Sequence, residues 1–487
     1  MTTPPTDLSR DPATRSRAYF AGAWHALDRT FPVFHPGNGQ LVGEVADCSA
    51  GDARQAIDAA ERALRSWRRV NGYERGLVLR RWFELMLAHK EPLARLMTLE
   101  MGKPITETRG EVHYAASFIE WCAEEAGRIA GERVNLRFPH KRGLTVQEPV
   151  GIVYAVTPWN FPAGMITRKA APALAAGCVM ILKPAELSPM TALYLAELWL
   201  EAGGPPDTFQ VLPTNDAPAF SQPLMADERV RKLTFTGSTE VGRLLYGQAA
   251  RTIKRVSLEL GGHAPFVVFD DADLEGAARE VIASKFRNAG QTCVCTNRVY
   301  VQRGVADAFT RLLTEKTAAL TVGDPLLDGT QVGPVVEQAG LDKIQAQVQD
   351  ALARGAKATT GGQAAGGLFF QPTVLTDVHP DSVILREETF GPVAPVVVFD
   401  TEEEALALAN ASEFGLAAYA YTRDLGRAFR VAEGLEYGIV GLNDGLPSAN
   451  APHIPFGGMK NSGVGREGGH WGLDEYLETK FISLSLV

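Results

Sequence analysis

One cysteine in a short polar stretch is the side chain of this sequence best suited to nucleophilic chemistry. Cys293 follows Gly290, Gln291 and Thr292, which are small or polar neighbours on a segment rich in backbone donors. A thiolate is a strong nucleophile, and surroundings that lower its pKa keep more of it ionised at neutral pH. Most free cysteines are simply small buried side chains, so this stretch alone does not decide between the two roles.

A carboxylate and a glycine turn are further candidates. Glu259 stands in the apolar run Val256-Ser-Leu-Glu-Leu-Gly-Gly-His263. There a carboxyl group would be partly desolvated and its pKa raised toward the range of a general base, although an exposed strand residue would fit the pattern too. In Phe235-Thr-Gly-Ser-Thr-Glu-Val-Gly-Arg243, two glycines precede a helix start that could receive a phosphate. The usual glycine-rich dinucleotide fingerprint is absent, so the pattern supports a simple turn and helix cap about as well as a phosphate site.

The surrounding sequence predicts the elements that must position these side chains. Residues 50–101 and 111–129 have helical composition with apolar positions at three-and-four spacing. Residues 150–157, 180–183 and 232–235 are short β-branched runs with helical segments between them. Strands and helices that alternate at this interval predict a parallel, doubly wound α/β sheet.

Composition limits the class of protein. A chain of 487 residues, 45% hydrophobic and 22% charged, predicts two or three packed domains. The net charge of −9 gives no footprint for nucleic acid or an anionic membrane. Five scattered cysteines favour a reducing compartment. Residues 1–10 have no signal-peptide pattern and no apolar run reaches the roughly 18 residues of a membrane helix, so a cytoplasmic protein is expected.

Six motifs in fixed order resemble the aldehyde dehydrogenase superfamily, and the match runs roughly from residue 18 to the end of the chain. The resemblance implies a Rossmann-type doubly wound NAD-binding domain (1–129 and 148–258), an α/β catalytic domain (259–460) and a small β oligomerisation arm (130–147 and 461–487). The motifs are Pro158-Trp-Asn-Phe-Pro162, Phe235-Thr-Gly-Ser, Leu258-Glu-Leu-Gly-Gly, Gly290-Gln-Thr-Cys, Glu388-Thr-Phe-Gly-Pro392 and Pro455-Phe-Gly-Gly-Met-Lys460.

The resemblance also implies a reaction. Cys293 would attack an aldehyde carbon, and the oxyanion would be held by the side-chain amide of Asn160 and the backbone N–H of Cys293. The thiohemiacetal would lose hydride to a nicotinamide and become a thioester. Glu259 would activate the water that hydrolyses the thioester to a carboxylate. A coenzyme A-acylating relative should lack this base, and a silent NAD-binding relative should lack one of the three residues.

The same pattern assigns the cofactor residues, and no metal site is expected. The carboxylate of Glu186 would accept hydrogen bonds from the ribose hydroxyls and repel a 2′-phosphate, so NAD is favoured, with NADP possible. A helix-cap role for Glu186 is the alternative. The other expected cofactor residues are Thr157, Trp159, Lys183, Gly237, Ser238, Glu388 and Phe390.

A narrower resemblance, to the succinate semialdehyde dehydrogenase branch, concerns the substrate. It rests on Ile166-Thr-Arg-Lys169, on residues 284–295 and on residues 437–448. It implies that Arg168, Arg287 and Ser448 grip the far carboxylate of succinate semialdehyde, since two guanidinium groups suit a planar anion. Glutarate semialdehyde and a sulfonated aldehyde remain alternatives, because His263 and residues 449–454 depart from the branch pattern. Residues 213–218 depart from it as well, where cofactor contacts near the adenine are expected.

Two further expectations follow from this resemblance. Cys295 is expected to form a reversible disulfide with Cys293 as a redox switch. The tail, residues 480–487, alternates like a strand and would be an unpaired edge in a monomer, so a homo-dimer or homo-tetramer is expected.

Overall fold

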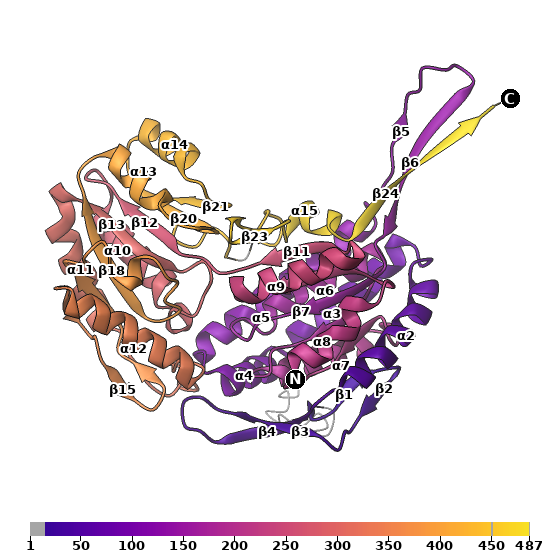
Figure 1. The fold of residues 1–487 in the computed structure, drawn as a ribbon, viewed down its shortest axis with the longest axis horizontal. Helices are drawn as coiled ribbons and strands as arrows, with labels where there is room; N and C mark the ends of the chain where they lie inside the picture. Colours follow the sequence, from indigo (N-terminus) through magenta and orange to yellow (C-terminus); the bar gives the residue numbers. More distant parts are fainter. Residues whose placement is uncertain (1–14, 450, 487) are drawn as a thin grey trace, which may run out of the picture.

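The computed structural model describes residues 15–449 and 451–486, which form two lobes and a projecting arm (Figure 1). Residues 1–10 and Asn450, which bear on expectations above, lie outside the described residues. Within the described part, none of the helices combines the length and apolarity needed to cross a bilayer.

The first lobe is built on an eight-stranded sheet whose five central strands are parallel. The three strands predicted from sequence are among them, each within two residues of its predicted bounds. Central strands such as β8 are buried along their whole length because helices cover both faces of the sheet. The strands, in spatial order, are β2 (Ala23–His25), β1 (Ala18–Phe20), β9 (Phe209–Val211), β8 (Val179–Lys183), β7 (Ile152–Val156), β10 (Val230–Thr236), β11 (Arg255–Glu259) and β23 (Gly463–Val464).

The helical stretch predicted over residues 50–101 is three helices rather than one. Asn71 caps the second by accepting the N–H of Glu74, and the chain turns again at His89. The next helix begins at Ile105, six residues before its predicted start, because Pro104 can open a helix. The helices of this lobe are α2 (Ala50–Trp67), α3 (Gly72–Ala88), α4 (Lys90–Met101), α5 (Ile105–Ala126), α6 (Gly164–Ala176), α7 (Pro189–Glu201), α8 (Ala217–Ala226), α9 (Thr239–Ala249) and η1 (Ala250–Thr252).

The second lobe is built on a seven-stranded sheet that is parallel except for one edge strand. In spatial order its strands are β14 (Lys357–Thr360), β17 (Thr373–Thr376), β18 (Val393–Phe399), β13 (Thr296–Gln302), β12 (Ala264–Val268), β20 (Ala417–Tyr421) and β21 (Ile439–Leu442). Its helices are α10 (Leu274–Lys285), η2 (Arg287–Gly290), η3 (Arg303–Val305), α11 (Ala306–Ala318), α12 (Gln338–Ala353), η4 (Val383–Leu385), α13 (Glu402–Asn410) and α14 (Leu425–Gly434). Short elements elsewhere are β3 (Thr30–Phe34), β4 (Leu41–Ala46), β15 (Ala364–Gly366), β16 (Phe369–Phe370), β19 (Phe414–Gly415), β22 (Met459–Lys460) and α15 (Gly469–Asp474).

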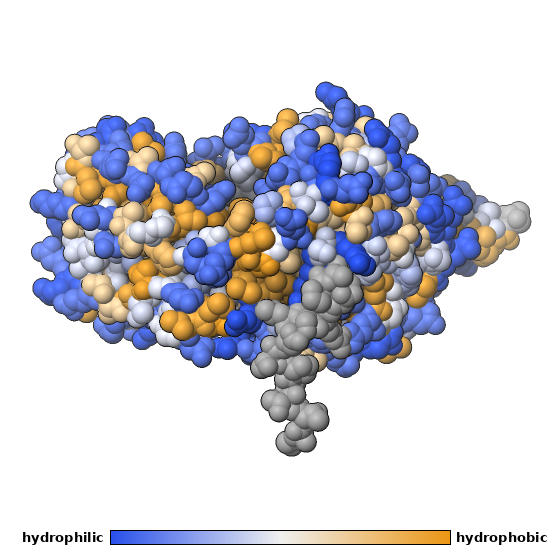
Figure 2. Space-filling view, turned by 90° about the horizontal axis from the view of Figure 1, so that it is seen from below, coloured by the Kyte–Doolittle hydropathy of each residue, from blue (hydrophilic) through white to orange (hydrophobic). Residues whose placement is uncertain are grey.

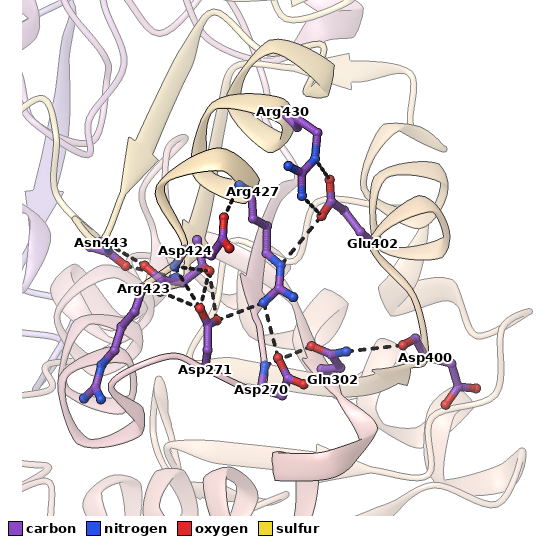
Figure 3. A network of polar contacts seen from close by, with 11 residues as sticks. Asp270, Asp271, Gln302, Asp400, Glu402, Arg423, Asp424, Arg427, Arg430 and Asn443 are labelled. Carbon is purple, nitrogen blue, oxygen red and sulfur yellow. Dashed lines mark hydrogen bonds and ion pairs between the residues drawn. The ribbon is translucent and has the colours of Figure 1, made fainter.

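A carboxylate ties together the carboxyl ends of β12 and β20 in this second lobe (Figure 3). Asp271 accepts the backbone N–H groups of Arg423 at 2.9 Å and Asp424 at 2.8 Å. It also forms an ion pair with Arg427 at 2.9 Å. This network stabilises the edge of the lobe and contributes no side chain to the cavities described below.

The arm is a three-stranded antiparallel sheet that leaves the first lobe at its far end (Figure 1). Strand β24 (Leu477–Ser485) pairs with β6 (Lys141–Pro149), which also pairs with β5 (Arg133–Val134). Apolar side chains, including Phe481, Ile482 and Leu484, are exposed on it, and Figure 2 shows apolar surface near the end of the projection.

The arm takes only part of the range expected for it. Gly463–Val464 pairs with β11 as the edge strand of the first sheet, so the segment from residue 461 to α15 packs with the first lobe. The pairing closes an edge of β11 that would otherwise leave backbone groups unsatisfied.

Candidate active site

Cys293 lies between two cavities, at the end of the loop that precedes β13. The arginine cavity, about 240 Å³, is lined by Arg168, Arg287 and Ser448 among others. The glycine cavity, about 350 Å³, includes Gly237, Gly261 and Gly340 in its wall. Burial raises the pKa of the Cys293 thiol to about 12, while the nearby Arg168 guanidinium lowers it. Arg168 is therefore a neighbouring charge that favours the thiolate, which is the form that attacks.

A turn with unusual backbone conformation presents this cysteine. Asn288, Ala289 and Gly290 have φ of 51°, 53° and 75°, all in the left-handed region. A Cβ at residue 290 would lie 2.2 Å from the carbonyl oxygen of Gly391, so only glycine fits. The side chain of Gln291 helps to fix the turn, since its Oε1 accepts the backbone N–H of Val336 at 2.9 Å.

Asn160 follows β7 and reaches the same loop from the first lobe. Its Nδ2 donates to the carbonyl oxygen of Gln291 at 3.1 Å, and its Oδ1 is buried without a hydrogen-bond partner. Asn160 and Cys293 both line the glycine cavity. The amide has a second N–H, which is the donor that an oxyanion at the cysteine would need.

Glu259 is the last residue of β11 and is buried, with Oε2 lacking a partner. Burial, and then the neighbouring Glu467 carboxylate, raise its pKa well above the usual value, while Arg168 and Lys169 lower it. The walls of the two cavities do not include Glu259. In this conformation the side chain must therefore turn to reach a substrate in either cavity.

A buried charge cluster that the sequence analysis did not find surrounds Glu259. Glu467 forms ion pairs with both Arg168 and Lys169, and Lys169 Nζ also donates to Thr236 Oγ1 at 2.6 Å. All three charged side chains are almost completely buried. One signal was available, because two consecutive cations in the apolar helix α6 require a buried acid nearby.

The two arginines predicted to bind a carboxylate differ in their surroundings. Arg168 is paired with Glu467, a carboxylate that it shares with Lys169, and its guanidinium lies 3.9 Å from the ring centroid of Phe456. Arg287 makes no ion pair among residues 15–449 and 451–486, and its Nε is buried without a partner. Ser448 lines the same cavity. Arg287 is thus the cation of this cavity that remains available to a substrate anion.

The structure brings five of the predicted cofactor residues together. Trp159, Gly237, Ser238, Glu388 and Phe390 all line the glycine cavity. Ser238 caps α9, so the positive end of that helix faces the cavity wall. Glu388 Oε1 accepts the N–H of Gly262 at 3.0 Å, and burial raises its pKa to about 7. The rings of Trp159 and Phe390 meet edge to face at 5.7 Å. Glycines, a helix start and a carboxylate fit a dinucleotide, which would supply a hydride acceptor beside Cys293.

Three predicted cofactor residues stand apart from this cavity. The backbone N–H of Thr157 donates to Lys183, and Lys183 Nζ donates to Glu186 Oε2 at 2.8 Å. Glu186 lines a separate cavity with residues 32–39 of the β3–β4 hairpin, and Val336 lies in the walls of both that cavity and the glycine cavity. Glu186 therefore lies one cavity further from Cys293 than the other cofactor residues.

Cys295 is buried on the far side of the cysteine loop. Its thiol donates to the carbonyl oxygen of Gly290 at 3.2 Å and lies 3.8 Å from Lys285 Nζ. Neither cavity includes Cys295 in its wall. A disulfide with Cys293 therefore requires the Cys295 thiol to give up its hydrogen bond to the carbonyl oxygen of Gly290.

Comparison with known proteins agrees with the geometry. A model of the aldehyde dehydrogenase family matches residues 24–482. The chain is 52% identical over 476 residues to an Escherichia coli protein named succinate-semialdehyde dehydrogenase (NADP+), covering 97% of this chain and 98% of the relative. It is 50% identical over 474 residues to a glutarate-semialdehyde dehydrogenase of Pseudomonas putida, covering 97% of this chain and 98% of the relative. The crystal structure of a succinate-semialdehyde dehydrogenase from Burkholderia pseudomallei has a TM-score of 0.96 at 49% identity, covering 98% of this chain and 99% of that one.

These findings define the class of the protein, an oxidoreductase that acts on aldehydes with NAD(P). The chain belongs to the aldehyde dehydrogenase family, which confirms the family and the α/β fold predicted from the motifs.

Proposed function

We propose that this enzyme oxidises succinate semialdehyde to succinate. The observation that carries the proposal is the arginine cavity, where Cys293 and the unpaired Arg287 line one space of about 240 Å³. A short aldehyde with a carboxylate at its other end can place each end against one of these groups. Glutarate semialdehyde is the second candidate, because a relative of that name is almost as similar to this chain as the succinate-semialdehyde relative is.

The proposed roles of the chain's own residues follow from their positions. Cys293 attacks the carbonyl carbon, and its backbone N–H together with the Asn160 amide stabilises the oxyanion. NAD(P)+, when bound, supplies the hydride acceptor. Glu259 turns toward the sulfur and takes a proton from the water that releases the acid, a role suited to a carboxyl group with a raised pKa.

Replacing Arg287 with methionine tests the substrate class. We expect kcat/KM for succinate semialdehyde to fall about 100-fold, because hydrogen bonds to a charged group contribute roughly 1.5–3 kcal/mol each. The value for uncharged butyraldehyde should stay within about threefold, since that substrate makes no such bond. The measurement is NADH or NADPH formation at ~340 nm, the usual absorbance of reduced nicotinamide.

The matched control is Arg279→Met, on an exposed part of α10 outside the arginine cavity. This substitution should leave kcat/KM unchanged for both aldehydes. Equal losses for the two aldehydes in Arg287→Met would remove the proposed role of Arg287. If wild-type enzyme used both aldehydes equally well, the anionic substrate class itself would be wrong.

We propose NAD as the preferred cofactor because of Glu186. Its carboxylate holds Lys183 Nζ at 2.8 Å and would repel a 2′-phosphate. In Glu186→Ser this repulsion is lost and the Lys183 ammonium becomes available to a phosphate. The ratio of kcat/KM for NADP to that for NAD should rise about 10- to 100-fold, which corresponds to roughly 1.4–2.8 kcal/mol. Steady-state kinetics with both cofactors, with the exposed Glu228→Ser as control, checks this; an unchanged ratio would count against Glu186.

The arm supports a homo-oligomer, which we propose as a dimer or tetramer. Strand β5 is only two residues long, so most of one edge of β6 has no partner strand among the described residues. Together with the exposed Phe481, Ile482 and Leu484, this edge is suited to pairing with a second copy of the chain.

A further inference from the structure

Glu107 has no part in the chemistry described so far, yet it lies in the wall of the arginine cavity. It stands in the first turn of α5, in the first lobe. Its Oε2 accepts the backbone N–H of Asn288 at 2.9 Å, across the space between the two lobes. Asn288 directly follows Arg287 and begins the turn that leads to Cys293. One carboxylate is therefore bonded to the backbone between the proposed anion receptor and the nucleophile.

That turn needs external support. Asn288 and Ala289 have positive φ, a conformation that is unfavourable for an L-residue such as alanine. Such a conformation persists only when surrounding contacts impose it. Asn288 Nδ2 donates to the carbonyl oxygens of Asn160 and Gln291, both at 3.2 Å. Among the described residues, Glu107 is the charged side chain that is hydrogen-bonded to this turn.

Two cations, Lys103 and Arg287, act on Glu107, and of these two only Arg287 lacks an ion-pair partner among the described residues. Lys103 is buried beside Glu107, but it already forms an ion pair with Glu111. Glu111 in turn accepts the N–H groups of Ala163 and Gly164 at the start of α6. Burial raises the pKa of Glu107 to about 7, against the opposing influence of Lys103 and Arg287. The bond to the turn, rather than neutralisation of Lys103, is thus the specific contact that Glu107 makes.

We propose that Glu107 is a positioning residue for substrate selection: its bond to the Asn288 N–H fixes the turn that aims Arg287 into the arginine cavity and presents Cys293. The selection of an anionic aldehyde through Arg287 rests on the proposed function. The placement of Cys293 does not depend on it.

Two conservative replacements separate position from charge. Glu107→Gln keeps the length and an acceptor oxygen but removes the charge. Glu107→Asp keeps the charge but withdraws the carboxylate from Asn288 by one methylene group. We expect Glu107→Asp to lower kcat/KM for succinate semialdehyde by about 10- to 100-fold, the loss of one charge-assisted hydrogen bond, and Glu107→Gln to stay within about threefold of wild type. Glu120→Asp, on the exposed face of the same helix, is the control.

Two further readouts test how the effect is transmitted. In the Arg287→Met background, adding Glu107→Asp should change kcat/KM by the same factor for succinate semialdehyde and for butyraldehyde. The guanidinium that the turn aims at the substrate is absent from that background. Alkylation of Cys293 by iodoacetamide, without any substrate, should slow by about tenfold in Glu107→Asp, the factor that roughly 1.4 kcal/mol produces.

The outcomes are distinct. An impaired Asp variant beside a near-normal Gln variant supports the proposal. An impaired Gln variant beside a normal Asp variant overturns it in favour of charge compensation, and two normal or two equally impaired variants also overturn it. If wild-type enzyme shows no preference for the anionic aldehyde, the proposed function fails, while the alkylation rates still decide whether Glu107 places Cys293.

Discussion

Replacing Glu259 with glutamine should give an enzyme that oxidises one equivalent of aldehyde per site and then stops. Cys293, Asn160 and the glycine cavity are unchanged in this variant, so the first half of the reaction can proceed. The acyl group then remains on Cys293, because glutamine cannot take a proton from water. A general base contributes typically 10²–10⁴-fold, so steady-state turnover should fall by a factor on the order of 10²–10⁴.

Rapid-mixing absorbance should show a burst of reduced cofactor, and intact-protein mass spectrometry should show an acyl adduct on Cys293. Cys293→Ala is the matched control and should give neither burst nor adduct. Continued turnover of Glu259→Gln at the wild-type rate would assign the base to another residue.

The pH dependence of turnover gives an independent check on Glu259. Burial and the Glu467 carboxylate raise its pKa, so it becomes ionised only at higher pH than a free glutamate. Since the ionised form is the base, wild-type turnover should rise with pH on its acid limb, and Glu259→Gln should lose that limb.

The second large effect is expected on stability. Glu467→Gln leaves Arg168 and Lys169 buried without their carboxylate, and breaking a buried ion pair in this way costs about 3–5 kcal/mol. We expect the midpoint of thermal unfolding, followed by circular dichroism, to fall by several degrees. Because Glu467 raises the pKa of Glu259, the acid limb of turnover should also move to lower pH in the surviving enzyme.

An exposed ion pair is the control for this stability effect. Glu413 pairs with Arg243 at 3.1 Å, with both side chains more than half exposed, and such pairs contribute about 1 kcal/mol or less. Glu413→Gln should therefore unfold close to the wild-type midpoint. A similar small change in Glu467→Gln would mean that the cluster around Arg168 does not stabilise the fold.

Much of this site could be predicted because its residues lie in short local motifs. Recognisable sequence motifs contain the nucleophile, Asn160 and the two arginines. Runs of β-branched residues predict strands β7, β8 and β10. The structure places Arg168, Arg287, Ser448 and Cys293 around one cavity. Their catalytic and binding roles stay predictions.

The sequence could not show which residues, distant along the chain, come into contact in the folded protein. Glu467 lies 299 residues from Arg168, so the two adjacent cations of α6 indicate that a buried acid is nearby but not which residue supplies it. The Glu107 bond to Asn288 likewise joins residues 181 positions apart. The placement of Glu259 outside both cavities depends on packing, since a Cβ at Gly457 would lie only 2.9 Å from its Oε1. None of these three contacts can be predicted from the sequence around either residue.

Cys293, Phe161 and Met165 lie in the walls of both the arginine cavity and the glycine cavity. With the aldehyde in the arginine cavity and the dinucleotide in the glycine cavity, as proposed, each reactant has its own access to the sulfur. A bound dinucleotide would then leave the aldehyde's cavity open, and the acid could depart while the dinucleotide is still in place. Excess aldehyde can for the same reason occupy its cavity after the dinucleotide has been reduced, which would show as substrate inhibition at high aldehyde concentration.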